Sequence, residues 1–168
     1  MPHAASSTGY PARFVLEGVP RVNFYKGGPR CPENVPLPSC VRACVDYLGD
    51  PRFGCKHTAS CGSGCLAPCS YAHCVGTSGA AAFLSWRPGW SEDNLDIRWS
   101  SDDPDAPFRE ALAGAGYGCE VLRRDACSAA DCRASIIESL YGLRRPVIAI
   151  GAVGPPESCL VTGYDEGG

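Results

Sequence analysis

The sequence predicts an α+β fold with helices packed on a mainly antiparallel sheet. Segments with a helical spacing of apolar residues come early, and two apolar runs of strand length, PVIAIGAV and SCLVTGYDE, cluster late. No internal repeat is visible. The length of 168 residues is sufficient for one domain with a hydrophobic core. Runs of strands that follow runs of helices are typical of α+β domains.

The composition excludes several functional classes. The apolar fraction of 45% and the charged fraction of 20% are ordinary for a globular protein, and the net charge is −3. The sequence has no basic cluster of the kind that binds nucleic acid, and no apolar run that is long enough for a membrane span. The N-terminus lacks the features of a secretory signal, so we expect a cytoplasmic protein with reduced thiols.

The chain begins with a segment that has little structural signal. Residues 1–12 read as a disordered leader, and residues 13–168 as the single domain. Val15, Val19 and Val22 indicate short extended segments, whereas residues 27–38 are rich in glycine and proline and predict a loop.

The first helix is predicted in SCVRACVDYLGDP. Ser39 is placed to cap its start, and Gly49 and Pro51 to end it. The spacing of its apolar residues predicts one buried stripe, made of Cys40, Ala43, Cys44, Tyr47 and Leu48.

A cysteine-rich loop is expected at 54–75, too rich in glycine to hold regular structure. The following GTSGAAAFLSW predicts a second helix that begins at Thr77 or Ser78, and LDIRWS alternates as a strand does. DAPFREALAGAGY predicts a third helix, capped by Asp105, and CEVLRR a short strand. SAADCRASIIESLYGL predicts a fourth helix, in which Ser128 and Asp131 match the capping-box pattern.

The last predicted strand, SCLVTGYDE, runs into a turn, GYDEGG, that would begin a hairpin. A hairpin needs a second strand after its turn. We therefore expect further C-terminal sequence of the same chain, and a fold truncated at this end.

The cysteine-rich loop allows three readings. Zinc sites commonly have ligands two to four residues apart, and sulfur with imidazole nitrogen suits Zn²⁺. The loop meets the spacing in part, so the sequence offers a candidate ligand set of Cys61, Cys65 and Cys69 with His57 or His73. Disulfides or plain reduced cysteines are the alternatives, and we favour the reduced cysteines because the spacing lacks a C-x2-C pair. No other cofactor is expected.

Several blocks of sequence, from about Leu16 onward, resemble the papain-like superfamily. The blocks are GVPRVNFY, GGPRCPENVPLPSC, GTSGAAAFLSW, RPGW and VGPPESCLVTGYDEGG. The chain looks similar in particular to the double-glycine (bacteriocin-processing) peptidases and to the N-terminal family of butirosin-type acyltransferases, which are bacterial proteins. The resemblance implies a papain-like domain in which a cysteine near the start of the first helix attacks a carbonyl carbon.

The resemblance also implies where the catalytic groups should lie. Cys40 is nearest to the nucleophile's place, and Cys31 is a second candidate. The place of the catalytic histidine is occupied by Glu157, and no histidine follows His73. A cysteine needs a cationic neighbour to be a thiolate at neutral pH, and a carboxylate such as Glu157 opposes this.

Two hypotheses for the function follow. In the first, the chain is a thiol-dependent acyl transferase or amide hydrolase, with an atypical site, that acts on a small molecule or on a peptide or acyl substrate. In the second, it is a catalytically silent relative that binds a ligand or partner, as a sensor domain does. The missing histidine favours the second hypothesis.

Overall fold

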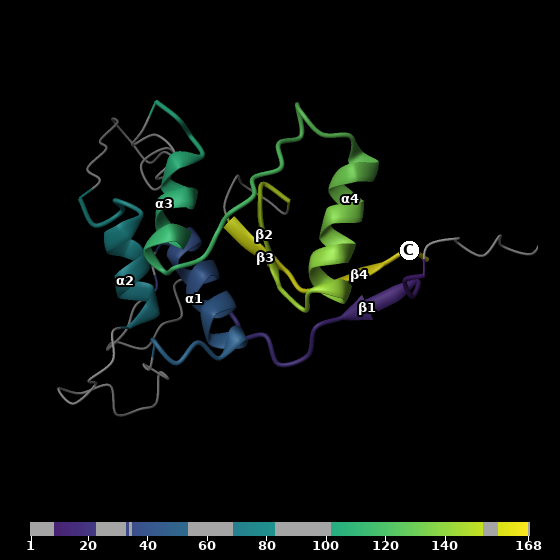
Figure 1. Ribbon diagram of the computed structural model, residues 1–168, viewed down its shortest axis with the longest axis horizontal. Helices are drawn as coiled ribbons and strands as arrows, with labels where there is room; N and C mark the ends of the chain where they lie inside the picture. The colour runs from purple at the N-terminus through teal and green to yellow at the C-terminus, as the bar shows by residue number, and fades with distance from the viewer. Residues whose placement is uncertain are drawn as a thin grey trace, which may run out of the picture.

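A computed structural model describes residues 9–22, 33, 35–53, 69–82, 102–152 and 158–167, and these form an α+β fold (Figure 1). The described helices are α1 (Pro36–Leu48), α2 (Ser70–Thr77), α3 (Ala106–Gly114) and α4 (Ala129–Ile137), and α4 continues as a π-helical turn, Glu138–Gly142. The described strands are β1 (Arg13–Val15), β2 (Val147–Ile150), β3 (Ser158–Val161) and β4 (Gly163–Asp165). The strand predicted in LDIRWS and most of the cysteine-rich loop lie outside these residues.

The strands form two small antiparallel pairs. In one pair β2 and β3 run side by side from Val147 opposite Val161 to Ile150 opposite Ser158. In the other pair β1 lies against β4, with Val15 opposite Gly163. The strand predicted in PVIAIGAV is confirmed, whereas SCLVTGYDE forms two strands, β3 and β4, and Gly163–Asp165 is a strand instead of part of the predicted turn. The described partner of β4 is β1, from the opposite end of the described chain, and the strand expected after the given sequence stays a prediction.

Helix α1 begins earlier than predicted. Its first residue is Pro36, and proline suits the first turn because the amides there have no partner within the helix. Ser39 is therefore not the cap. It lies inside the helix, where its hydroxyl donates to the Val35 carbonyl at 3.0 Å. The helix ends before Gly49, as predicted.

The buried face of α1 also differs from the predicted stripe. Cys40 and Ala43 are buried as expected, but Leu48 is exposed and Tyr47 only half-buried. The side chains that α1 contributes to the main core are Leu37, Val41 and Val45. The first three turns of α1 are enclosed on nearly every side, so a single stripe does not describe this helix.

The second helix was predicted in the wrong place. Helix α2 lies inside the segment predicted as loop and ends where a helix was expected to start. The Thr77 hydroxyl donates to the His73 carbonyl at 3.1 Å, and the Ser78 hydroxyl to the Val75 carbonyl at 3.4 Å. Both hydroxyls therefore bind the turn before them, and they end a helix instead of capping the next one.

The third helix is confirmed with a different cap. Asp105 precedes α3, but its side chain accepts no capping hydrogen bond. Asp103 acts instead, since its carboxylate accepts from the Asp105 amide at 2.9 Å and its carbonyl from the Ala106 amide at 3.1 Å.

CEVLRR is not a strand, because no described strand pairs with it. The fourth helix begins with the predicted cap, since the Ser128 hydroxyl accepts from the Asp131 amide at 3.1 Å.

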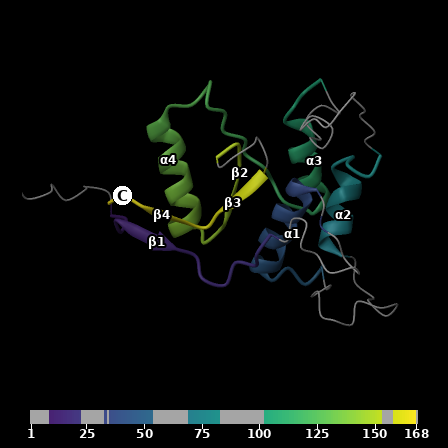
Figure 2. The ribbon, with the colours of Figure 1, turned by 180° about the vertical axis from the view of Figure 1, so that it is seen from behind.

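The main hydrophobic core lies among α1, α2 and α3. Its buried members are Leu37, Val41, Val45, Cys74, Phe108 and Ala111. These three helices gather on one side of the molecule, whereas α4 lies with the strands on the other side (Figures 1 and 2). Helix α1 also contacts β3, so it joins the helical side to the strands. In the part of the chain that the structure describes, no helix has the length and apolar character needed to cross a membrane.

Candidate functional site

Cys40 is the fifth residue of α1, and its side chain is completely buried, with 0% of the residue exposed. Burial raises the pKa of its thiol to about 12, and the nearby thiols of Cys44, Cys159 and Cys74 add to the increase. The positive charge of Arg42 lowers this pKa, but by less than the burial raises it. At neutral pH Cys40 is therefore a protonated core thiol, which is a poor nucleophile.

His73, on α2, has side-chain contacts with residues other than Cys40. The Nε2 atom of His73 lies 2.8 Å from the Gly114 carbonyl oxygen, and the ring lies against Phe53 with 5.4 Å between the ring centroids. Because a carbonyl oxygen can only accept, Nε2 must carry the hydrogen. None of the main charges that act on Cys40 is a histidine. The described residues therefore give Cys40 no imidazole base.

The other two predicted catalytic residues, Cys31 and Glu157, lie outside the described residues. Their roles stay predictions. The structure does describe the strand that follows Glu157, because β3 begins at Ser158. Cys159 of this strand is among the thiols that raise the pKa of Cys40, and α1 contacts β3.

A groove opens on the side of β3 that faces away from β2. The pairing of β1 with β4 extends one step further, to a hydrogen bond from the Leu16 amide to the Thr162 carbonyl at 2.7 Å. Gly18 then has a φ of +79°, which favours glycine and turns the chain away from the strand. The space between the two diverging segments has a volume of about 570 Å³.

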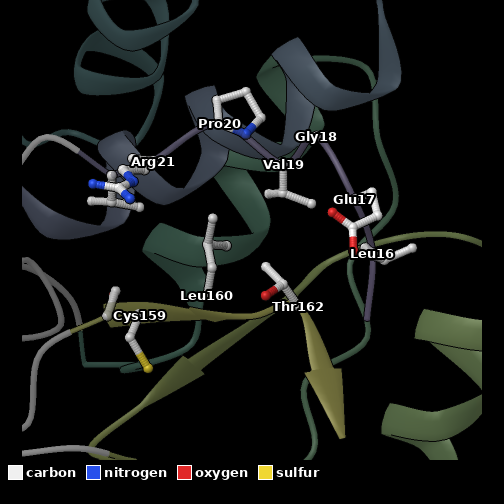
Figure 3. Close-up of a pocket in the computed structure, with 11 residues that line it drawn as sticks. Leu16, Glu17, Gly18, Val19, Pro20, Arg21, Cys159, Leu160 and Thr162 are labelled. Atoms are coloured by element: carbon white, nitrogen blue, oxygen red, sulfur yellow. The ribbon is translucent and has the colours of Figure 1, made fainter. Parts of the chain in front are cut away.

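The groove has an apolar centre and one charge of each sign. Leu160 points from β3 toward Val19 on the opposite wall, whereas Glu17 and Arg21 lie toward opposite ends (Figure 3). Glu17 lies near Thr162, and Arg21 lies toward the Cys159 end. Both charged residues are exposed, so they are accessible to a ligand.

The groove wall at Arg21 is anchored by a buried ion cluster. Arg42 of α1 donates from Nη2 to the Arg21 carbonyl at 2.8 Å and from Nη1 to the Asp46 carboxylate at 3.0 Å. Its Nε lies 2.5 Å from Glu33 Oε1, although it is not aligned for a hydrogen bond, and Nη2 donates to Glu33 Oε2 at 3.1 Å. The Arg42 and Glu33 side chains are 3% and 2% exposed. This cluster fixes the Arg21 backbone to α1.

Two of the five candidate zinc ligands can be placed. Cys69 precedes the first residue of α2 and His73 lies one turn later, and the described residues contain no group of three or more His, Cys, Asp or Glu side chains arranged to hold a metal. The bond from His73 Nε2 to a carbonyl leaves Nδ1 as the nitrogen with a lone pair. Cys61, Cys65 and His57 lie outside the described residues, so the zinc site stays a prediction.

The described residues define an α+β fold with a buried thiol, Cys40, on its first helix and a groove beside β3. Comparisons with protein-family models, with curated proteins and with solved structures found no match. The function must therefore be argued from the chain itself.

Proposed function

We propose that this chain is a catalytically silent domain of the papain-like type that binds an extended peptide segment in the groove between residues 16–22 and β3. The observation that carries the proposal is the burial of Cys40, because a nucleophile must reach its substrate. A catalytic cysteine must be accessible and must form a thiolate near neutral pH. The Cys40 thiol is buried and has a pKa of about 12, so it meets neither requirement.

The arrangement of α1 and β3 supports the papain-like part of the proposal. The resemblance implies that a nucleophilic cysteine on the first helix faces a catalytic base at the strand before VTGYD. Here Cys40 of α1 lies near Cys159 of β3, and Glu157 precedes β3 directly in the sequence. Contact between α1 and β3 is in line with what the resemblance implies for the elements that would carry the cysteine and the base.

The unpaired edge of β3 supports an extended peptide as the ligand. β3 pairs with β2 along one edge, and the Thr162 carbonyl accepts from the Leu16 amide at the other edge, where the amides and carbonyls of β3 that do not face β2 lie. No described segment pairs with this edge beyond Thr162. An added strand would satisfy these groups, as in other cases of strand addition.

Alkylation separates the silent domain from the alternative hypothesis, a thiol-dependent acyl transferase or amide hydrolase. If the domain is silent, iodoacetamide at pH 7.5 should modify the half-exposed Cys119 and Cys132 before it modifies Cys40, and Cys40 should react only as the protein unfolds. Mass spectrometry of tryptic peptides gives the order of labelling. Selective and fast labelling of Cys40, or of Cys31, in the folded protein would overturn the silent-domain proposal in favour of the enzyme.

Charge complementarity tests the groove. The peptide acetyl-Lys-Val-Val-Val-Glu-amide offers an apolar centre to Leu160 and opposite charges to Glu17 and Arg21. It should bind about fivefold more tightly than the matched peptides with two lysines or two glutamates, which is the effect of about 1 kcal/mol for an exposed pair. Isothermal titration calorimetry measures the three affinities.

Variants of the groove make the test specific. Arg21→Glu leaves two acidic ends and should shift the preference to the peptide with two lysines. Glu110→Lys, on the exposed face of α3, is the matched control and should leave the order unchanged. An absence of saturable binding, or a preference that Arg21→Glu does not move, would contradict peptide binding at this groove.

A further inference from the structure

The start of α4 brings two cysteines together. Ser128 is the N-cap, with φ −68° and ψ 154°, and its hydroxyl accepts from the Asp131 amide. Cys127 is therefore the residue before the cap and Cys132 the fourth residue of the helix. Side chains at these two positions meet in many helices, where an apolar pair fixes the entry of the chain. Here both members of the pair are thiols.

The contacts of Cys127 show how close the two residues lie. Its Sγ is 3.6 Å from the Ser128 carbonyl oxygen, and the Cys132 amide donates to the same oxygen at 3.0 Å. The pKa of the Cys127 thiol is raised to about 11, chiefly by the neighbouring Cys132 thiol. The Ser128 carbonyl oxygen thus lies beside both the Cys127 sulfur and the Cys132 amide, at the first turn of α4.

We propose that Cys127 and Cys132 form a reversible intramolecular disulfide that fastens the first turn of α4 to the preceding segment. Both residues are partly exposed, so a small oxidant can reach them. With hydrogen peroxide, one thiol attacks the peroxide to give a sulfenic acid and water. The second sulfur then displaces the hydroxyl group, which leaves with a proton as water. Two thiols and one peroxide thus give one disulfide and two waters, and a dithiol reductant reverses the change.

The pair differs from the other described cysteines. Cys40 and Cys74 are buried in the core, where an oxidant cannot reach them directly. Cys119 is half-buried, as Cys127 and Cys132 are, but its pKa is raised by burial and influenced by Arg109 and Asp105, with no thiol among the groups that act on it. Cys119 therefore serves as an internal control for unspecific oxidation.

The sequence allows a direct assay. Trypsin cleaves after Arg124 and Arg133, so both cysteines lie in one peptide, DACSAADCR, without a third. The folded protein is exposed to hydrogen peroxide, quenched in acid, alkylated with iodoacetamide under denaturing conditions and digested. We expect this peptide to lose two hydrogens and to carry no alkyl group, whereas the peptide with Cys119 is fully alkylated. Treatment with dithiothreitol before alkylation should restore two alkyl groups.

Variants complete the test. In Cys127→Ser and Cys132→Ser the remaining cysteine should be alkylated or overoxidised, and no form lacking two hydrogens should appear. Cys119→Ser should leave the disulfide unchanged. Complete double alkylation of the wild-type peptide after exposure, a link to any other cysteine, or the same mass loss in unfolded protein at the same rate would overturn the proposal.

Discussion

Arg42 carries a positive charge in the interior, and only its partners offset the loss of water around it. The guanidinium meets Glu33, Asp46 and the Arg21 carbonyl, while the Arg42 and Glu33 side chains are almost fully buried. Removing one member of a buried pair leaves the other charge without compensation, which costs about 3–5 kcal/mol. Arg42→Met should therefore lower the free energy of unfolding by about this amount, as measured by urea denaturation.

Two matched variants separate this effect from a loss of packing. Arg42→Met combined with Glu33→Leu removes both charges and should recover most of the stability. Arg109→Ala removes an exposed ion pair with Asp103 and should cost less than about 1 kcal/mol. If Arg42→Met costs no more than Arg109→Ala, the buried cluster does not anchor the Arg21 wall of the groove.

At the scale of elements, the disulfide proposed at α4 has a measurable effect on stability. Closing a loop from Cys127 to Cys132 restricts the unfolded chain, and the loop-entropy model gives about 2 kcal/mol for so short a loop. The peroxide-treated protein should therefore melt several degrees above the reduced protein in a thermal scan. Cys127→Ser, in which no loop can close, should show no such difference. An equal increase in that variant would assign the change to another cysteine.

The elements that could be predicted are those that local sequence determines. Ser128 and Asp131 predict the start of α4 because the cap lies within one turn of chain. The start of α2 was missed because the glycines before it suggested a loop throughout, and because Thr77 and Ser78 are equally good at either end of a helix. CEVLRR has the composition of a strand, but a strand also needs a neighbour, and the described chain supplies none.

The site could be predicted only in part. The sequence placed Cys40 on the first helix, and the structure agrees. The burial of its thiol could not be predicted, because it depends on packing from α2 and β3, which are distant in the sequence. The groove depends on the pairing of β1 with β4, which no local pattern indicates.

For the whole molecule, Gly163 determines whether the two ends of the described chain can pair. A Cβ at this position would lie 2.7 Å from the Phe14 carbonyl oxygen, closer than such atoms approach. Gly163→Ala should therefore push β4 from β1 and lower the free energy of unfolding by about 1–3 kcal/mol. Gly76→Ala, in α2 with nothing within 4 Å of the new atom, is the control and should raise it by up to about 1 kcal/mol. Equal effects in urea denaturation would contradict a tight β1–β4 contact.

The pairing of β1 with β4 has a consequence for the order of folding. It joins segments separated by almost the whole described chain, so the loop that it closes is long and its entropic cost must be met before the contact is gained. Turns within helices and the short β2–β3 hairpin do not carry this cost. The strand pair that borders the groove should therefore assemble last, and its backbone amides should exchange with deuterium sooner than those of α1. A partly folded chain would then carry β1 and β4 as two unpaired strands until the two ends of the described chain meet.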